Sequence, residues 1–282
     1  MSVSIVKASG QAEDFDIRKL VDSLIRSGAS EDIALNIAQK VAAQITPRLR
    51  TKHIFRMARK LLRQYNRAAD MRYSIKRGIY ALGPAGYQFE QYFARILREY
   101  GYSVEVNKFL NGYCVTHEVD VFATKADEGF VIECKYHSNG GNPTDVKTAL
   151  YIHSRFIDIK RAYESTPDSP VLIRQGWLVT NTRCSADAIK FAECMGLKIV
   201  SWRYPEKESL EKMIEDKSLY PVTILTSVKK PILDILFRNK FIFAKDIADI
   251  DEQTFVARSG LDKEIAGILK READELCFFR QP

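Results

Sequence analysis

Residues 131–137 read Val-Ile-Glu-Cys-Lys-Tyr-His and carry the most informative pattern in the chain. Successive side chains of a β-strand point to opposite faces of a sheet. Glu133 and Lys135 would therefore share one face, while Ile132 and Cys134 would share the other. The apolar residues around Glu133 predict an interior strand, where unpaired charge is costly and is usually kept for function.

A second acidic strand precedes this one. Residues 117–121 read His-Glu-Val-Asp-Val, and simple alternation places Glu118 and Asp120 on one face. Two neighbouring strands could then present Asp120, Glu133 and Lys135 together at one rim of a sheet. Paired carboxylates suit Mg²⁺, and a lysine beside the metal can orient an attacking water. The alternative for so short a pattern is a surface salt bridge on a solvated strand.

Strands and helices alternate through the middle of the sequence, which indicates an α/β sandwich around a mixed sheet. Strands are predicted over residues 103–108, 117–123, 130–136, 176–180 and 197–202, with helices over 88–97, 147–165 and 185–195. A short hairpin and four helices are predicted before this region, and a short helical region after it.

The predicted fold class is therefore α/β multidomain. We expect a mainly helical N-terminal domain over residues 1–82, an α/β sandwich with a central mixed sheet over 86–205, and a small all-α C-terminal domain over 220–282. The Gly-Pro-Ala-Gly sequence of residues 83–86 is predicted to be a linker.

Positive charge is concentrated at the start of the chain. Of 282 residues, 43 are Lys or Arg and 36 are Asp or Glu, which gives a net charge of +7. Residues 1–80 alone hold 16 Lys or Arg against 7 Asp or Glu, so the whole excess lies there. This asymmetry predicts a polyanionic partner for the first segment, such as a nucleic acid or a nucleotide.

Composition excludes several other classes of protein. No apolar run is long enough to span a membrane and no signal peptide precedes the first residues, so we expect a cytoplasmic protein with no membrane partner. Five cysteines without a CxxC pair, and four histidines without HxxxH spacing, indicate neither a disulfide framework nor a zinc site.

Several segments between residues 86 and 202 resemble, in order, the Mrr-like branch of the PD-(D/E)xK nucleases. The segments are residues 86–90, 98–102, 118–123, 132–136, 177–181, 186–192 and 196–199. The resemblance implies a restriction-endonuclease-like fold, with Asp120 and Glu133 as Mg²⁺ ligands and Lys135 as the catalytic lysine. It also implies that Glu90, on the leading helix, reaches a second metal or holds the site. Family members often carry Gln where this sequence has Glu133.

The first eighty residues resemble an ATP-cone, the nucleotide-sensing module of ribonucleotide reductases and their repressor. The matching residues are Val6, Lys7, Gly10, Glu13, Phe15, Asp16, Lys19, Leu20, Thr51, Arg72 and Tyr73. Lys7 and Lys19 would place cations on a triphosphate, and Gly10 permits a tight turn.

Three further residues complete this predicted nucleotide site. Thr51 is predicted to cap the third helix, where its hydroxyl and backbone N–H groups suit a phosphate. The resemblance implies that Glu13 and Asp16 contact the ribose or base of ATP or dATP. No GxxxxGK[ST] or GxGxxG motif supports another kind of nucleotide site. The alternative is a small basic helical domain that binds DNA or only packs.

The C-terminal region resembles a helix-hairpin-helix module, with the hairpin at residues 259–262. Such hairpins hold a DNA phosphate with backbone N–H groups. Asp262 replaces the usual second glycine and would oppose a phosphate. Two roles remain open for this region: binding of DNA, and helical packing or dimerisation.

Together these resemblances imply a Mg²⁺-dependent DNA endonuclease of the restriction or defence type. ATP or dATP would act as an effector, the partner would be DNA, and we expect a homo-oligomer, a dimer. Two alternatives remain, a nucleotide-responsive DNA-binding regulator with an inactive nuclease fold and a structure-specific, junction-resolving nuclease.

Overall fold

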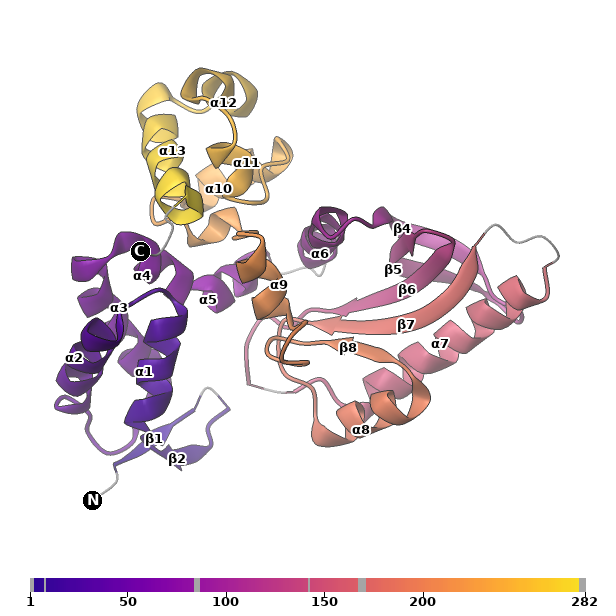
Figure 1. The fold of residues 1–282 in the computed structure, drawn as a ribbon, viewed down its shortest axis with the longest axis horizontal. Coiled ribbons are helices and arrows are strands. Elements are labelled where there is room, and N and C mark those ends of the chain that lie inside the picture. Colours follow the sequence, from indigo (N-terminus) through magenta and orange to yellow (C-terminus); the bar gives the residue numbers. More distant parts are fainter. Residues whose placement is uncertain (1–2, 8, 84–86, 142, 167–170, 279–282) are drawn as a thin grey trace. The chain divides into compact units, whose positions relative to one another are not determined.

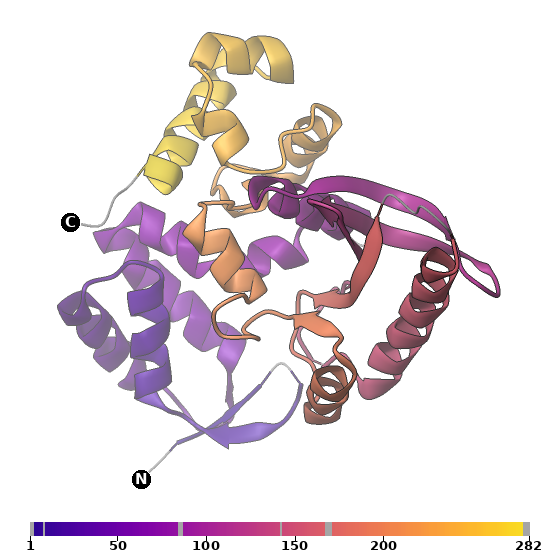
Figure 2. The same ribbon diagram turned by 45° about the vertical axis from the view of Figure 1, so that its right-hand side comes forward.

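The chain divides into two compact units in the computed structural model (Figures 1 and 2), which describes residues 3–7, 9–83, 87–141, 143–166 and 171–278. Met1–Ile79 and Ser218–Pro282 together form one unit, which we call the terminal unit. Tyr80–Lys217 form the other, which we call the central unit.

The N-terminal part of the terminal unit is a small sheet beside a group of helices. Its strands are β1 (Ser4–Val6), β2 (Ala12–Asp14) and β3 (Leu49–Arg50), and its helices are α1 (Ile17–Arg26), α2 (Glu31–Ala42), α3 (Thr51–Tyr65), α4 (Arg67–Tyr73) and α5 (Ile75–Tyr80). The sheet order is β2-β1-β3, with β1 antiparallel to β2 and parallel to β3. Apolar side chains repeat along α1, α2 and α3 at helical spacing and form one core.

The C-terminal part of the same unit is helical. It contains the short 3₁₀ helix η1 (Val222–Ile224) and the helices α10 (Lys230–Arg238), α11 (Lys245–Ala248), α12 (Glu252–Ser259) and α13 (Lys263–Phe278). Helix α13 packs on α11, α12 and α4. Glu272 on α13 is fully buried and pairs with Arg67 of α4, so an ion pair joins the two ends of the chain.

The central unit is built on one mixed five-stranded sheet. Its strands, in sheet order, are β4 (Ser103–Asn111), β5 (Thr116–Lys125), β6 (Glu128–Lys135), β7 (Leu172–Thr180) and β8 (Lys198–Val200). The first three strands are antiparallel neighbours, and the last three are parallel. The helices are α6 (Tyr87–Glu99), α7 (Val146–Glu164), α8 (Ala186–Met195) and α9 (Leu210–Asp216).

Helices α6 and α7 contact opposite faces of this sheet. The ring of Phe89 on α6 lies 5.8 Å from that of Tyr136, just beyond β6. Val131 of β6 instead shares a buried cluster with Phe156 of α7. Even-numbered side chains of β6 therefore face α6 and odd-numbered ones face α7, which confirms the alternation predicted for this strand.

The coarse fold predicted from sequence is confirmed, since the chain is an α/β protein with mixed sheets. Each helix and strand predicted in the middle of the chain is present within a few residues of its expected bounds. The predicted fourth helix is instead two helices, α4 and α5, that meet at Ser74. We predicted separate domains over residues 1–82 and 220–282. In the structure, these two segments contribute to one compact unit. Residues 84–86 of the predicted linker lie outside the described residues.

No helix in the described part of the chain is long and apolar enough to cross a membrane.

Candidate active site

Strands β5 and β6 separate at the acidic residues. Their regular pairing ends at Val121 and Ile132. Beyond that pair the backbone N–H of Cys134 donates to the carboxylate of Asp120, at 2.7 Å, instead of to a strand carbonyl. A side chain has thus taken over a ladder hydrogen bond, and it fixes Asp120 beside the end of β6.

The alternation of side chains along β5 is interrupted close to Asp120. The pairs on either side place Asn107 of β4 opposite Asp120, and Asn107 has a left-handed φ of 51°. Val119 and Phe122 share one buried cluster although they are three residues apart, so simple alternation breaks between them. The interruption lies between Val119 and Phe122, so the prediction that Glu118 and Asp120 share one face stays a prediction.

Glu133 is directed toward helix α7. Only 9% of its surface is exposed, and a carboxylate oxygen lies 2.7 Å from the guanidinium of Arg155. Arg155 also donates to the backbone carbonyl of Glu118, so it links α7 to both acidic strands. The sequence alone did not identify Arg155, because it lies 22 positions beyond Glu133 on a helix with many charged residues.

Four acidic or ionisable side chains influence one another electrostatically here. Burial raises the pKa of Glu90, and Asp120 raises it further, while a hydrogen bond with Asn107 opposes both. Burial also raises the pKa of Asp120, against the hydrogen bond from Cys134. Burial, and then the charges of all three carboxylates, raise the pKa of the Cys134 thiol well above its usual value.

Glu133 has the largest carboxyl shift of this group. Burial, followed by the charge of Asp120, raises its pKa to about 8 against the opposing effect of Arg155, and Glu90 adds to the rise. Carboxylates that raise one another's pKa lie near one another in space. The structure therefore brings together Asp120, Glu133 and Glu90, three of the four residues predicted for the catalytic site.

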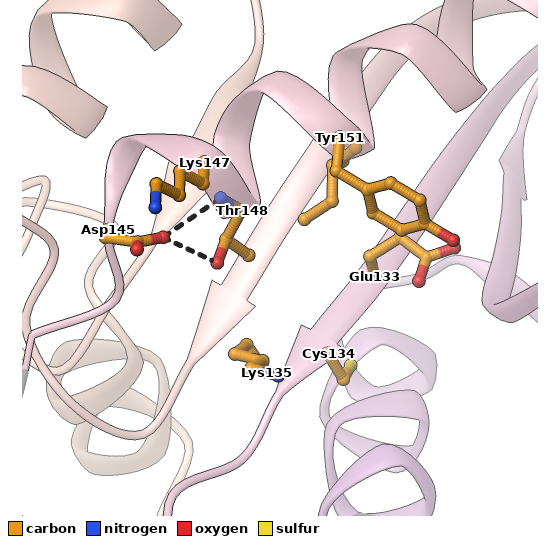
Figure 3. Close-up of a pocket in the computed structure, with 8 residues that line it drawn as sticks. Glu133, Cys134, Lys135, Asp145, Lys147, Thr148 and Tyr151 are labelled. Carbon is orange, nitrogen blue, oxygen red and sulfur yellow. Dashed lines mark hydrogen bonds between the residues drawn. The ribbon is translucent and has the colours of Figure 1, made fainter.

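Lys135 and Glu133 line the same cavity, which has a volume of about 470 Å³. The start of α7 forms another wall with Lys147, Thr148 and Tyr151 (Figure 3). Asp145 caps this helix by accepting hydrogen bonds from Thr148. Lys135 is exposed at the strand end, where its ammonium is accessible to a ligand in the cavity.

The donor set suits a metal held by two carboxylates. Mg²⁺ typically binds one or two protein carboxylates and keeps several waters. Asp120 and Glu133 come from adjacent strands, and burial, the largest cause of their raised pKa values, disfavours the ionised forms that a divalent cation would stabilise. Within the described residues there is no group of three or more His, Cys, Asp or Glu suited to a metal.

The predicted nucleotide residues gather around the β1–β2 hairpin. Lys7 forms an ion pair with Glu13 at 2.6 Å, and the ammonium of Lys19 lies 3.9 Å from the same carboxylate. Gly10 has a φ of +86° in the turn, a conformation that L side chains rarely adopt. Two lysines and one glutamate thus converge beside the turn that the sequence predicts at Gly10.

Asp16 and Thr51 stand at helix starts near this sheet. Asp16 caps α1 by accepting a 2.9 Å hydrogen bond from the backbone N–H of Arg18. Thr51 is the first residue of α3, and the cap is Arg50, which makes no side-chain cap hydrogen bond. The predicted capping role of Thr51 is therefore wrong by one position. Its hydroxyl still lies in the first turn of the helix, directly after the strand that pairs with β1.

The hairpin at residues 259–262 is also present. Gly260 ends α12 with a φ of +68°, and Asp262 accepts a hydrogen bond of 2.8 Å from the backbone N–H of Glu264 at the start of α13. The Asp262 carboxylate thus already satisfies one N–H group that a phosphate would need.

Comparisons with known proteins identify relatives without an assigned function. Residues 220–277 match the family described as AF1548-like, C-terminal. An uncharacterized protein of Archaeoglobus fulgidus is 39% identical over 160 residues, which is 57% of this chain and 86% of that protein. A crystal structure described as protein of unknown function AF1548 is 34% identical, covers 70% of this chain and 100% of its own, and superposes with a TM-score of 0.57. On these similarities, the chain belongs to the AF1548-like family.

Proposed function

We propose that the chain is a Mg²⁺-dependent DNA endonuclease of the restriction or defence type, regulated by ATP or dATP. One observation carries the proposal: Asp120 and Glu133 crowd together where β5 and β6 separate, with Lys135 at the end of the same strand. The resemblance to Mrr-like PD-(D/E)xK nucleases assigns the same three residues to catalysis. We also infer that the central unit has a restriction-endonuclease-like fold.

Each residue has a defined task under this proposal. Asp120 and Glu133 would hold Mg²⁺, and Glu90 would support the site or reach a second ion. Bound Mg²⁺ supplies Lewis-acid stabilisation of the charge on a phosphodiester. The Lys135 ammonium would orient the attacking water and favour loss of its proton, and Asp120 would keep its orientation through the N–H of Cys134.

The N-terminal part of the terminal unit would bind the effector. We infer an ATP-cone there, with the cations of Lys7 and Lys19 on the triphosphate and Glu13 and Asp16 toward the sugar or base. The ion pairs around Glu13 keep both ammonium groups near the glycine turn. Because the sequence shows no motor domain, ATP would act as an effector and not as an energy source.

A cleavage assay tests the catalytic part. Supercoiled plasmid and linear DNA are incubated with Mg²⁺, with and without ATP or dATP, and with wild-type protein or Asp120→Asn. The asparagine oxygen can still accept from Cys134, so we expect an intact fold and a loss of cleavage of at least about 100-fold. Glu118→Gln, a neighbouring exposed carboxylate, is the matched control and should cleave normally. Cleavage that survives Asp120→Asn would overturn the site.

One observation favours a second candidate, a nucleotide-responsive DNA-binding regulator without nuclease activity. Arg155 already supplies positive charge to Glu133 at 2.7 Å. In a protein that never binds a metal, this ion pair would be the contact that partly offsets the buried negative charge. Absence of cleavage under every nucleotide condition, together with retained DNA binding, would favour this candidate.

A further inference from the structure

A basic cleft lies on helices α3–α5 of the terminal unit. Its volume is about 280 Å³. The residues that line it are Arg56, Arg59, Lys60, Arg63, Asp70 and Arg77. Asp70 is the one carboxylate among these lining residues, so five cations face one anion. We call this feature the arginine cleft, and none of its residues belongs to the nucleotide site predicted from the sequence.

A buried ion pair holds one wall of the cleft in place. Asp70 is 1% exposed and accepts two hydrogen bonds from Arg59, at 2.6 and 2.9 Å. Such a paired, two-point contact fixes the guanidinium plane. Asp70 therefore neutralises Arg59 and orients it, while the other four cations of the cleft face a cavity with no second lining carboxylate.

Positive groups are crowded around Arg77 of the cleft. Burial lowers the pKa of Arg77, and the charges of Arg59 and then Arg56 lower it further. Arg59 and Arg77 both lie over the ring of Phe55, at 5.9 and 5.3 Å from its centroid. Phe55 itself is stacked on Tyr73 with the ring centroids 5.0 Å apart. This repulsion between like charges would be relieved by a bound anion.

The cations continue along α3 beyond the cleft. This helix contains five cations and no Asp or Glu, and Lys52, Arg56, Lys60 and Arg63 follow one another at spacings of four, four and three residues. Residues at such spacings lie on one helix face. At 1.5 Å per residue the row is about 16 Å long. One strand of DNA presents a phosphate about every 3.4 Å along the axis, so the row matches about five phosphates.

We propose that the arginine cleft and the adjoining face of α3 bind the phosphate backbone of DNA, independently of base sequence. The length of the row favours a polymer over a single triphosphate, which would occupy only part of it. Contacts of lysine and arginine with phosphate fix the position of a protein on DNA without reading its bases. This inference rests on the proposed function in one respect, that DNA is the substrate.

Fluorescence anisotropy with a labelled DNA duplex in EDTA tests the proposal without any cleavage. The double variant Arg56→Glu/Lys60→Glu changes two exposed residues and leaves the Arg59–Asp70 pair intact. We expect at least about a tenfold loss of affinity and a salt dependence whose slope falls by about two. Arg26→Glu/Lys40→Glu, with the same change in net charge at exposed positions of α1 and α2, should lower affinity less than about twofold.

Two results would overturn the proposal. One is an equal loss of DNA affinity in both double variants, which would reflect net charge alone. The other is a loss of ATP or dATP binding by Arg56→Glu/Lys60→Glu with unchanged DNA binding, which would identify the cleft as a nucleotide site. Failure of the nuclease proposal is separable, because wild-type protein would then bind DNA through the cleft yet never cleave it with Mg²⁺.

Discussion

At the scale of single residues, Glu133 is expected to control how metal binding depends on pH. Its pKa lies near 8 instead of the usual 4.5, so near pH 6 the folded, metal-free protein carries a proton on this carboxyl group. Mg²⁺ requires the ionised form, and binding must release that proton. We therefore expect Mg²⁺ affinity to rise from about pH 6 to about pH 8, by up to about tenfold per pH unit, and then to level off.

Calorimetric titration with Mg²⁺ across this pH range measures the effect. Glu133→Gln is the control, since its amide does not titrate and should bind weakly at every pH. An affinity that is constant over the range would contradict the proposed ligand. The same shift destabilises the metal-free fold as pH rises from about 4.5 to about 8, because only the unfolded chain readily gives up the proton in that window.

Arg155 provides a second test at the same scale. It opposes the rise in the pKa of Glu133, so Arg155→Met should raise that pKa further. The pH at which Mg²⁺ binds half-maximally should then move upward by about 1 to 3 units. Arg155→Lys keeps the positive charge and should move it less. Tighter binding by Arg155→Met at every pH would mean instead that Arg155 competes with the metal.

At the scale of helices and strands, the link between α3 and α4 is expected to dominate local stability. Asp70→Asn would remove the charge that Arg59 meets inside the terminal unit. Breaking a buried pair by changing one partner costs about 3 to 5 kcal/mol, and the lower end applies because Arg59 is 27% exposed. Chemical denaturation measures the loss. Asp32→Asn, at an exposed position of α2, is the control and should change the free energy of unfolding by at most about 0.5 kcal/mol.

Secondary structure followed from the sequence where local signals were strong. Helices α6, α7 and α8 begin and end within a few residues of their predicted bounds. The interrupted alternation between Val119 and Phe122 could not be predicted, because nothing in the local pattern of β5 encodes it. Strand β3 has only two residues and is stabilised by pairing with β1, which no local pattern encodes.

The candidate site was predictable only in part for the same reason. Asp120, Glu133 and Lys135 lie on strands whose pattern is local. Arg155 and the arginine cleft depend on how helices pack, so their charges looked like ordinary solvated residues in the sequence. The net charge of residues 1–80 indicated a polyanionic partner but did not show which helix face concentrates it.

At the scale of the whole molecule, the terminal unit is discontinuous in sequence. Residues 218–282 return to pack with residues 1–79, and Gly78 permits the close approach because a side chain there would collide with Ile224. The carbonyl of Gly78 also accepts a 2.8 Å hydrogen bond from Thr223. Contacts between residues so far apart in the sequence cannot be inferred from periodicity, which explains why the two segments were predicted as separate domains.

Glu272 should therefore determine the stability of the terminal unit as a whole. It is fully buried and is bound by Arg67 from α4 and by Ser227, whose hydroxyl donates at 2.7 Å. Glu272→Ala would leave the partners of this carboxylate without their acceptor, at a cost of about 3 to 5 kcal/mol. For a unit of this size that corresponds to a fall of roughly 10 °C in Tm.

Differential scanning calorimetry can follow this because domains that fold as separate units give separate transitions. We expect Glu272→Ala to lower the terminal transition and to leave the central one in place. Glu275→Ala is the matched control on the same helix, since Glu275 is 47% exposed and lies 3.9 Å from Arg67. It should lower Tm by no more than about 2 °C, as exposed ion pairs contribute little. Equal shifts of both transitions would contradict the division into two units, and no shift would contradict the role of Glu272.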